Sequence, residues 1–224
     1  TGVRQSKETE AKVQSDYLLT YTNSWGEHSL TATAGFTTYY NKLENLNGAR
    51  TQGVGLVIPD NPDKWYVSIG DAATATNGST QWERSTVSVL ARALYNYKGK
   101  YLFNGSYRRD GSSRLSKQER WGNFWSVAGA WNIMREGFMS KYSFLSNLRI
   151  RASYGINGTL PSDNYGYMSL MSYTSKYMGN PGGTITTVTN DKLSWETSYN
   201  TNVGIDFGFF GQRLRGTVEY FNRD

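Results

Sequence analysis

The chain has 224 residues, no cysteine, one histidine, and a formal charge of +6 from 24 basic and 18 acidic residues. These numbers exclude disulfide frameworks, thiolate zinc sites and cysteine nucleophiles, and they leave no pair of histidines for a metal site. The basic residues are dispersed, so the chain has no basic arm for nucleic acid. Aromatic residues reach 15%, which argues against a disordered chain. No stretch approaches the ~18 uncharged apolar residues that a membrane-spanning helix needs.

Signals for catalysis are also weak. The single histidine, His28, follows a turn at Gly26 and Glu27, and we predict a solvated turn position for it rather than a catalytic role. The sequence contains no Walker loop and no dinucleotide fingerprint. A glycosidase would need a carboxylate pair, and the sequence identifies none. The chain is therefore expected not to be an enzyme, and to have no catalytic residue, no metal and no cofactor.

Period-two alternation dominates the chain. Apolar and aromatic residues alternate with small or polar ones, as in the segment where Phe103 and Tyr107 flank Ser106. The pattern predicts an all-β, antiparallel protein of about eight strands joined alternately by short and long connections. The predicted strands lie near 16–25, 28–41, 81–97, 100–111, 121–134, 147–157, 195–210 and 213–224, and the long outside loops are 42–80, 111–120 and 158–194.

The polar residues of these strands share one face, which carries small side chains and scattered charges. A soluble sandwich would bury its apolar face and turn its polar face to water. A polar face with few lysines instead suits a water-filled lumen crossed by ion pairs, while the apolar face suits lipid. Strands of about ten residues with aromatic ends predict a transmembrane β-barrel. The charged residues expected to form wall ion pairs are Arg92, Arg108, Asp110, Arg149, Arg151, Asp206, Arg215 and Glu219.

Two further features belong to the ends of the strands. Aromatic residues at the apolar face are expected to form an interfacial girdle rather than ligand platforms. The stretch 134–146 interrupts the alternation and could form a short helix on the side of the tight turns. The predicted girdle residues are Trp25, Tyr95, Tyr97, Tyr101 and Trp131.

Three linked blocks carry a more specific signal. Asn96–Tyr101, Tyr107–Arg114 and Arg120–Trp131 closely resemble the C-terminal barrel of SusC/RagA-type TonB-dependent transporters. The likeness extends over about residues 16–224. Further matching segments are Leu148–Gly155, Leu193–Thr197, Asn202–Asp206 and Phe209–Leu214.

The resemblance implies a 22-stranded barrel with an N-terminal plug that imports oligosaccharides or peptides across the bacterial outer membrane under TonB drive. It also implies a SusD-like surface lipoprotein as a partner, contact with outer-membrane lipid, and coupling to the TonB complex through the N-terminal part. Only about eight strands and no plug are recognisable, so residues 1–224 are expected to be a partial barrel. No nucleic-acid partner is expected.

Ligand contacts would come from loop tips and the upper lumen, where rings can stack on sugars or peptide side chains. Two alternatives remain open: a self-contained eight-stranded outer-membrane barrel with a structural or adhesive role, and a soluble carbohydrate-binding β-sandwich. The candidate ligand-binding residues are Trp65, Tyr66, Trp82, Arg108, Asp110, Trp121, Tyr165, Tyr167 and Tyr173.

Overall fold

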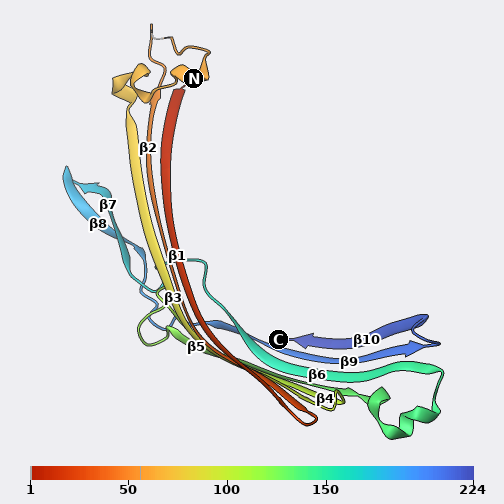
Figure 1. Cartoon of the computed structure of the whole chain (residues 1–224). Helices are drawn as coiled ribbons and strands as arrows, with labels where there is room; N and C mark the ends of the chain where they lie inside the picture. Colours follow the sequence, from red (N-terminus) through yellow and green to blue (C-terminus); the bar gives the residue numbers. More distant parts are fainter. Residues whose placement is uncertain (1, 56) are drawn as a thin grey trace. The chain divides into compact units, whose positions relative to one another are not determined.

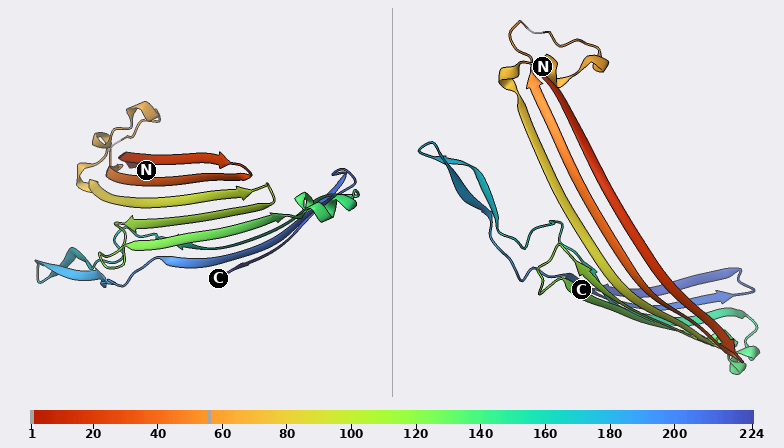
Figure 2. Two further views of the ribbon diagram at one scale, coloured as in Figure 1. Left: turned by 60° about the horizontal axis from the view of Figure 1, so that its bottom comes forward. Right: turned by 60° about the vertical axis from the view of Figure 1, so that its left-hand side comes forward.

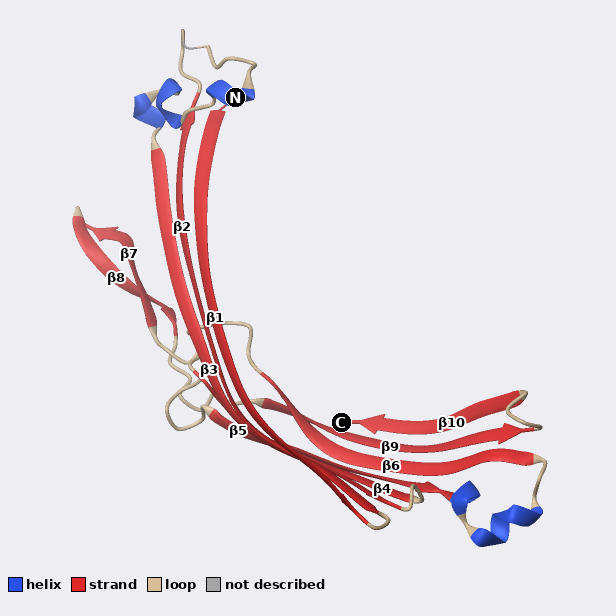
Figure 3. Ribbon diagram, in the orientation of Figure 1, coloured by secondary structure: helices blue, strands red, loops and turns tan. Residues whose placement is uncertain are grey.

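The computed structural model describes residues 2–55 and 57–224, and most of these lie in β-strands (Figure 3). Eight long strands form one sheet in the order β1-β2-β3-β4-β5-β6-β9-β10, and β7 and β8 form a separate hairpin between β6 and β9 (Figure 1). The strands are β1 (Gly2–Trp25), β2 (His28–Thr51), β3 (Thr76–Tyr97), β4 (Tyr101–Ser112), β5 (Trp121–Asn132), β6 (Leu145–Thr159), β7 (Leu170–Tyr177), β8 (Asn180–Thr187), β9 (Glu196–Phe209) and β10 (Leu214–Arg223).

This architecture confirms the predicted all-β class with about eight antiparallel strands. Two views in Figure 2 show the successive strands side by side. In the described residues the sheet is open, with β1 and β10 as its edge strands. The helices are five short 3-10 turns, and no helix of the described chain has the length and apolarity to cross a membrane. They are η1 (Pro62–Lys64), η2 (Val67–Ile69), η3 (Ala72–Thr74), η4 (Ile133–Arg135) and η5 (Gly137–Lys141).

The first three strands are much longer than the alternation predicted. β1 begins at Gly2 instead of near 16, β2 continues to Thr51, and β3 begins at Thr76, so the loop expected at 42–80 covers only 52–75. The extra stretches carry charged residues at successive positions, such as Lys7 and Glu8, and this removes the period-two signal although the backbone stays extended. The expected loop 158–194 likewise contains the β7–β8 hairpin.

The chain divides into two compact units, one of residues 1–14 and 39–85 and the other of 15–38 and 86–224. In the first unit, charged side chains pair with charged or polar neighbours along the strands. Lys42 Nζ lies 2.6 Å from Glu44 Oε1, and Tyr40 donates to Glu83 Oε2 at 2.9 Å. Because of these charged positions, the described residues of the first unit form no continuous apolar face. The strand segments of the second unit form one.

Strand register defines the two faces of the second unit. Tyr101 of β4 lies opposite Tyr97 of β3 and Trp131 of β5, and Trp131 lies opposite Ile150 of β6. We call the face with these residues the apolar face. The opposite, polar face carries the alternate positions of the same strands, including Asn104, Ser106, Arg108, Asp110, Ser126 and Ser153.

Large apolar side chains of the apolar face are exposed, whereas several polar side chains of the opposite face are buried at the end near the long connections. On the apolar face Phe103 is 51% exposed and Val203 is 43% exposed. On the polar face Ser88, Ser112 and Asp110 are 1%, 3% and 9% exposed. Large apolar side chains turned outward together with buried polar ones are expected for a sheet that meets lipid on one side.

Tight connections join β1–β2, β3–β4 and β9–β10, and the short 3-10 helices η4 and η5 join β5–β6. Figure 1 shows the β3–β4, β9–β10 and β5–β6 connections at one end of the second unit. In the β3–β4 turn, Lys98 and Gly99 have φ of 56° and 64°, as a type I′ hairpin turn requires. The Asn96 side chain accepts a hydrogen bond from Gly99 N at 2.8 Å and closes this turn. The longer connections, residues 113–120 and 160–195, join the opposite ends of the same strands.

Beside these turns the predicted girdle forms a row of rings on the apolar face. Successive centroids are 5.8 Å apart for Trp25 and His28, 4.6 Å for His28 and Tyr97, and 6.3 Å for Tyr97 and Tyr101. Tyr101 and Trp131 continue the row at 6.4 Å. The prediction of a solvated turn position for His28 is therefore wrong. His28 is the first residue of β2 and its ring packs among the aromatic residues.

Candidate ligand-binding wall

Arg108 and Asp110 form a fixed polar group on the polar face, close to the long connections. Arg108 Nε donates to Asp110 Oδ1 at 2.6 Å, and Arg108 Nη2 donates to Ser88 Oγ at 3.0 Å. Ser88 lies directly opposite Asp110 in the β3–β4 register, so the two strands hold the guanidinium from both sides. The Arg108 side chain is still 48% exposed. A held guanidinium with an exposed surface can donate hydrogen bonds to a carboxylate or to sugar hydroxyls.

An aromatic pair that the sequence pattern did not predict as part of a site lies next to this group. Phe124 of β5 is opposite Arg108 in register and only 8% exposed, and its ring meets that of Trp195 edge to face at 5.1 Å. Gly122 and Gly158 leave the space for the Phe124 ring, because a Cβ at either position would collide with it. Trp195 Nε1 donates to Arg120 O at 3.1 Å. The pair closes one end of the polar face with apolar surface.

The two long connections of the second unit are tied together. Arg114 donates from Nε to Asn164 Oδ1 and from Nη1 to Pro161 O, both at 3.0 Å. Ser116 Oγ donates to Asp191 O at 2.7 Å. Between them Leu115 is fully buried. We call the contacts of Arg114 and Ser116 the loop clamp.

Three of the predicted site residues lie in the β6–β9 connection. Tyr165 and Tyr167 are half-buried, and the Tyr167 carbonyl accepts a hydrogen bond from Asn190 N at 3.3 Å. Tyr173 lies on β7 and is 69% exposed. Tyr165 and Tyr167 therefore belong to the connection that the loop clamp holds, while Tyr173 projects from the separate hairpin.

Trp121 lies on the apolar face and not on the polar face with Arg108. Its register partner is Gly111, and the guanidinium of Arg109 lies 5.2 Å from its ring centroid. The ring is 44% exposed. This position fits a second group of interfacial aromatics, at the end of the strands that carries the long connections, better than a ligand platform.

The remaining predicted residues belong to the first unit. Trp65 follows η1 and donates from Nε1 to Pro59 O at 2.7 Å, so its ring helps to hold the 52–75 loop. Tyr66 precedes η2 and is 59% exposed. Trp82 lies on β3, where Arg84 sits 5.1 Å from its ring centroid. The nine predicted residues are thus divided between two units and two faces, and an ion pair joins Arg108 to Asp110.

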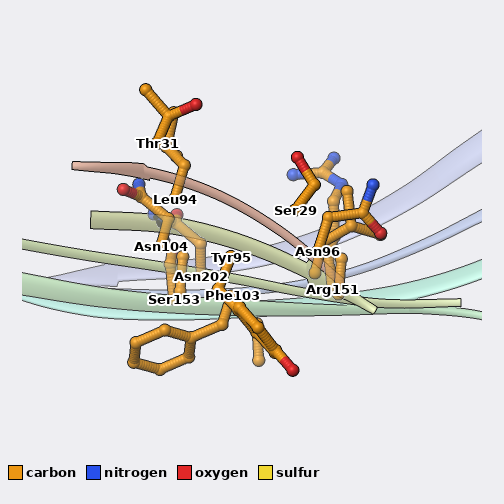
Figure 4. A pocket seen from close by; sticks show the side chains of 15 residues that line it. Ser29, Thr31, Leu94, Tyr95, Asn96, Phe103, Asn104, Arg151, Ser153 and Asn202 are labelled. Carbon is orange, nitrogen blue, oxygen red and sulfur yellow. Dashed lines mark hydrogen bonds between the residues drawn. The ribbon is translucent and has the colours of Figure 1, made fainter. Parts of the chain in front are cut away.

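Close to the tight turns, the polar face contains a hollow of about 450 Å³ (Figure 4). In Figure 4, Thr31, Leu94 and Asn104 extend to one side of the sheet, and Phe103 extends to the other. Asn202 and Arg151 also line the hollow, together with alanines of β5. None of the nine predicted ligand residues lines it.

Four of the eight predicted wall charges form ion pairs beside the hollow. Arg92 instead donates from Nε to Asn104 Oδ1 at 3.2 Å, and Arg215 is exposed on β10. Arg149 binds Asp206 at 2.9 Å across β6 and β9, and Arg151 reaches Glu219 of β10 at 3.1 Å. Gly204 lies between them, and a Cβ there would come within 3.0 Å of the Arg151 guanidinium. These charges balance one another along the wall. Among the described residues, no group of three or more metal-ligating side chains comes together.

The sequence and the fold of this chain are similar to those of known proteins. Residues 3–224 match a family model described as "TonB dependent receptor-like, beta-barrel". The chain belongs to this family of TonB-dependent receptor β-barrels. Members of the family are outer-membrane barrels that act as transporters, and the likeness to SusC/RagA-type transporters is confirmed.

Among curated relatives, this TonB-dependent receptor chain is 33% identical over 213 residues to TonB-dependent receptor P3 of Formosa agariphila. That alignment covers 92% of this chain and 20% of the relative. This chain is also 37% identical over 145 residues to TonB-dependent receptor SusC of Bacteroides thetaiotaomicron, and that alignment covers 61% of this chain and 14% of SusC. The chain thus spans about a fifth or less of the length of these relatives.

Solved structures agree on the fold. The structure of the RagAB peptide transporter matches with a TM-score of 0.86 and 24% identity, covering 99% of this chain and 24% of the other. The RagAB peptide importer in its open-open state matches with a TM-score of 0.82 and 25% identity, covering 98% of this chain and 24% of the other.

Proposed function

We propose that the chain forms part of the barrel wall of a SusC-like active importer in the bacterial outer membrane, which carries oligosaccharides or peptides under TonB drive. The observation that carries the proposal is the burial pattern of the second unit, with large apolar side chains exposed and Ser88, Ser112 and Asp110 buried. Family membership and the likeness to SusC and RagAB support it.

Two groups on the polar face suit contact with the transported ligand. Arg108 presents a held guanidinium, and the half-buried ring of Trp195, which packs on the buried Phe124, presents apolar surface beside it. An oligosaccharide offers hydroxyls and apolar ring faces, and a peptide offers a carboxylate and side chains, so either class can use both groups. Tyr165, Tyr167 and Tyr173 extend the candidate surface into the long connection. We propose that a SusD-like lipoprotein covers this side and that the TonB complex acts through an N-terminal plug.

The two alternatives fit less well. A self-contained eight-stranded barrel would pair its first and last strands, whereas β1 and β10 are edges of the described sheet. A soluble sandwich would cover its apolar face with a second sheet, whereas Phe103, Tyr107 and Val203 of that face are 51%, 43% and 43% exposed.

Cysteine labelling along β4 tests the wall. Single cysteines are placed at Phe103 and Tyr107 of the apolar face and at Ser106 and Arg108 of the polar face, in the whole transporter in native membranes. We expect a water-soluble maleimide to reach positions 106 and 108 several-fold faster than 103 and 107. The reverse pattern would refute a lipid-facing apolar face.

Uptake by cells tests the ligand contact of Arg108. Arg108→Gln removes the guanidinium, and Arg109→Gln is the matched control because Arg109 is the next residue on the opposite face. The probes are fluorescein-labelled malto-oligosaccharides and fluorescein-labelled casein peptides. A hydrogen bond from a charged group contributes about 1.5–3 kcal/mol, so we expect at least a tenfold loss of uptake at low probe concentration for Arg108→Gln alone. Equal uptake by the two variants, at equal surface expression, would remove Arg108 from the site.

A further inference from the structure

The connection between β5 and β6, residues 133–144, contains η4 and η5 and has two kinds of apolar side chain. Ile133 and Met139 are each 8% exposed and pack inward. Phe138, Tyr142 and Phe144 are 57%, 49% and 50% exposed. Polar residues could fill these exposed positions without loss of stability. Three exposed aromatic rings within seven residues therefore indicate a surface that contacts a partner.

One carboxylate fixes the place of this connection. Glu136 accepts hydrogen bonds from Lys100 Nζ at 2.9 Å, Tyr101 Oη at 2.9 Å and Trp131 Nε1 at 3.1 Å. Its side chain is 14% exposed. We call Glu136 with these three donors the Glu136 clasp. It joins the connection to the row of rings on the apolar face.

The clasp also gives the depth of the connection relative to a membrane. Tyr and Trp favour the membrane interface with the ring toward the acyl chains and the polar tip toward the headgroups. The polar tips of Tyr101 and Trp131 both end on Glu136. Glu136 must therefore lie at headgroup depth, and the exposed rings that follow it in sequence lie close to the same level.

The far end of the connection returns to the same face. Phe144 stacks on Phe209 with centroids 6.2 Å apart, and Tyr142 meets Phe144 at 6.3 Å. Phe209 shares the apolar face of β9 with Val203 and Ile205. Both ends of the connection are thus continuous with the membrane-facing surface. Lys141, next to Tyr142, is exposed and can meet a lipid phosphate.

We propose that residues 133–144 are a membrane-interface anchor, in which Phe138 and Tyr142 enter the headgroup and acyl boundary of the periplasmic leaflet and Lys141 lies among the lipid phosphates. The periplasmic leaflet follows from the rule that outer-membrane barrels have their short turns on the periplasmic side. The inference rests on the outer-membrane placement of the proposed function, but not on the ligand or on transport.

Spin-label accessibility tests the anchor. The chain contains no cysteine, so each variant adds one labelling site to it: Phe138→Cys, Tyr142→Cys, Phe103→Cys as a control within the apolar face, and Lys117→Cys as a control in a long connection. The whole transporter is placed in vesicles of phosphatidylethanolamine and phosphatidylglycerol. We expect labels at 138 and 142 to meet oxygen more often, and a water-soluble nickel chelate several-fold less often, than the label at 117.

Other outcomes overturn the proposal in distinguishable ways. If labels at 138 and 142 behave like 117 while 103 stays in lipid, the connection lies in water and only the anchor fails. If 103 is also open to the nickel chelate, the membrane placement itself fails. If 138 and 142 are protected from both reagents, protein rather than lipid covers the connection.

Discussion

Glu136 shows how one side chain can fix a segment of twelve residues at the edge of the sheet, 133–144. Hydrogen bonds from Lys100, Trp131 and Tyr101 lower the pKa of its carboxyl from 4.5 to about 2. The carboxylate is therefore ionised throughout the physiological range, and the clasp does not act as a switch near neutral pH. Arg108 is a second example, because its two contacts with Asp110 and Ser88 hold a charged head that is still half exposed.

The lowered pKa predicts when the clasp opens. A carboxyl whose pKa is lower in the folded than in the unfolded protein contributes its full stabilisation when the pH is above the unfolded-state pKa. This contribution is lost as the pH falls toward the folded-state pKa. A spin label at Lys141→Cys should therefore keep its mobility from pH 7.5 to pH 5 and gain mobility only below about pH 4.5. In Glu136→Gln this acid transition should be absent, while a label at Phe103→Cys reports any general unfolding. A transition between pH 7 and 5 would contradict the clasp.

At the scale of elements, the strands of the second unit set the faces and the long connections set the end of the polar face. Leu115 is fully buried although it lies outside any strand, because Arg114 and Ser116 on either side bind the β6–β9 connection. Phe124 of β5 and Trp195 of the β6–β9 connection add a ring contact beside them. The connections therefore form a packed structure beside Arg108 and not two independent loops.

This packing predicts the effect of breaking the loop clamp. Arg114→Ala removes hydrogen bonds to Asn164 and Pro161, each of which has a charged donor, and should destabilise the local structure by about 1–3 kcal/mol. Limited proteolysis of 113–120 and 160–195 should then be at least fivefold faster. Lys117→Ala is the matched control, since Lys117 is exposed on the same connection. Equal cleavage rates would show that the clamp contributes nothing to the order of the connections.

For the whole molecule, the arrangement of short and long connections predicts its orientation in the membrane. The β9–β10 turn at Phe210 and Gly211 is short, whereas the β7–β8 hairpin belongs to a long connection. Outer-membrane barrels place long loops outside the cell and short turns in the periplasm. The polar face with Arg108, Phe124 and Trp195 would then meet ligand from the cell exterior.

Epitope insertion tests this orientation. An epitope between Met178 and Gly179, where the hairpin turns and Met178 is 86% exposed, should be stained on intact cells. The same epitope between Gly211 and Gln212 should be stained only after the outer membrane is permeabilised. Blots for total protein control for expression. Staining in the opposite order would reverse the proposed topology.

The sequence by itself determined the class, the two faces and the family. Alternation such as Phe103, Ser106, Tyr107 and Arg108 depends only on local geometry, since successive side chains of a strand point to opposite faces. Tight turns such as Lys98–Gly99 are local in the same sense, so both features can be read along the chain. The blocks from Asn96 to Trp131 then indicated the family that residues 3–224 match.

Only the tertiary structure decided which distant residues meet. Arg114 binds Asn164 across 50 positions and Ser116 binds Asp191 across 75, and strand register placed Trp121 with the apolar face. The first three strands extended past the end of their alternation, because backbone pairing continues where charges hide the pattern. Contacts between separate connections depend on register and on the packing of long segments. The alternation of residues along a strand encodes neither the register nor this packing. The wall around Arg108 could therefore be only partly predicted from the sequence.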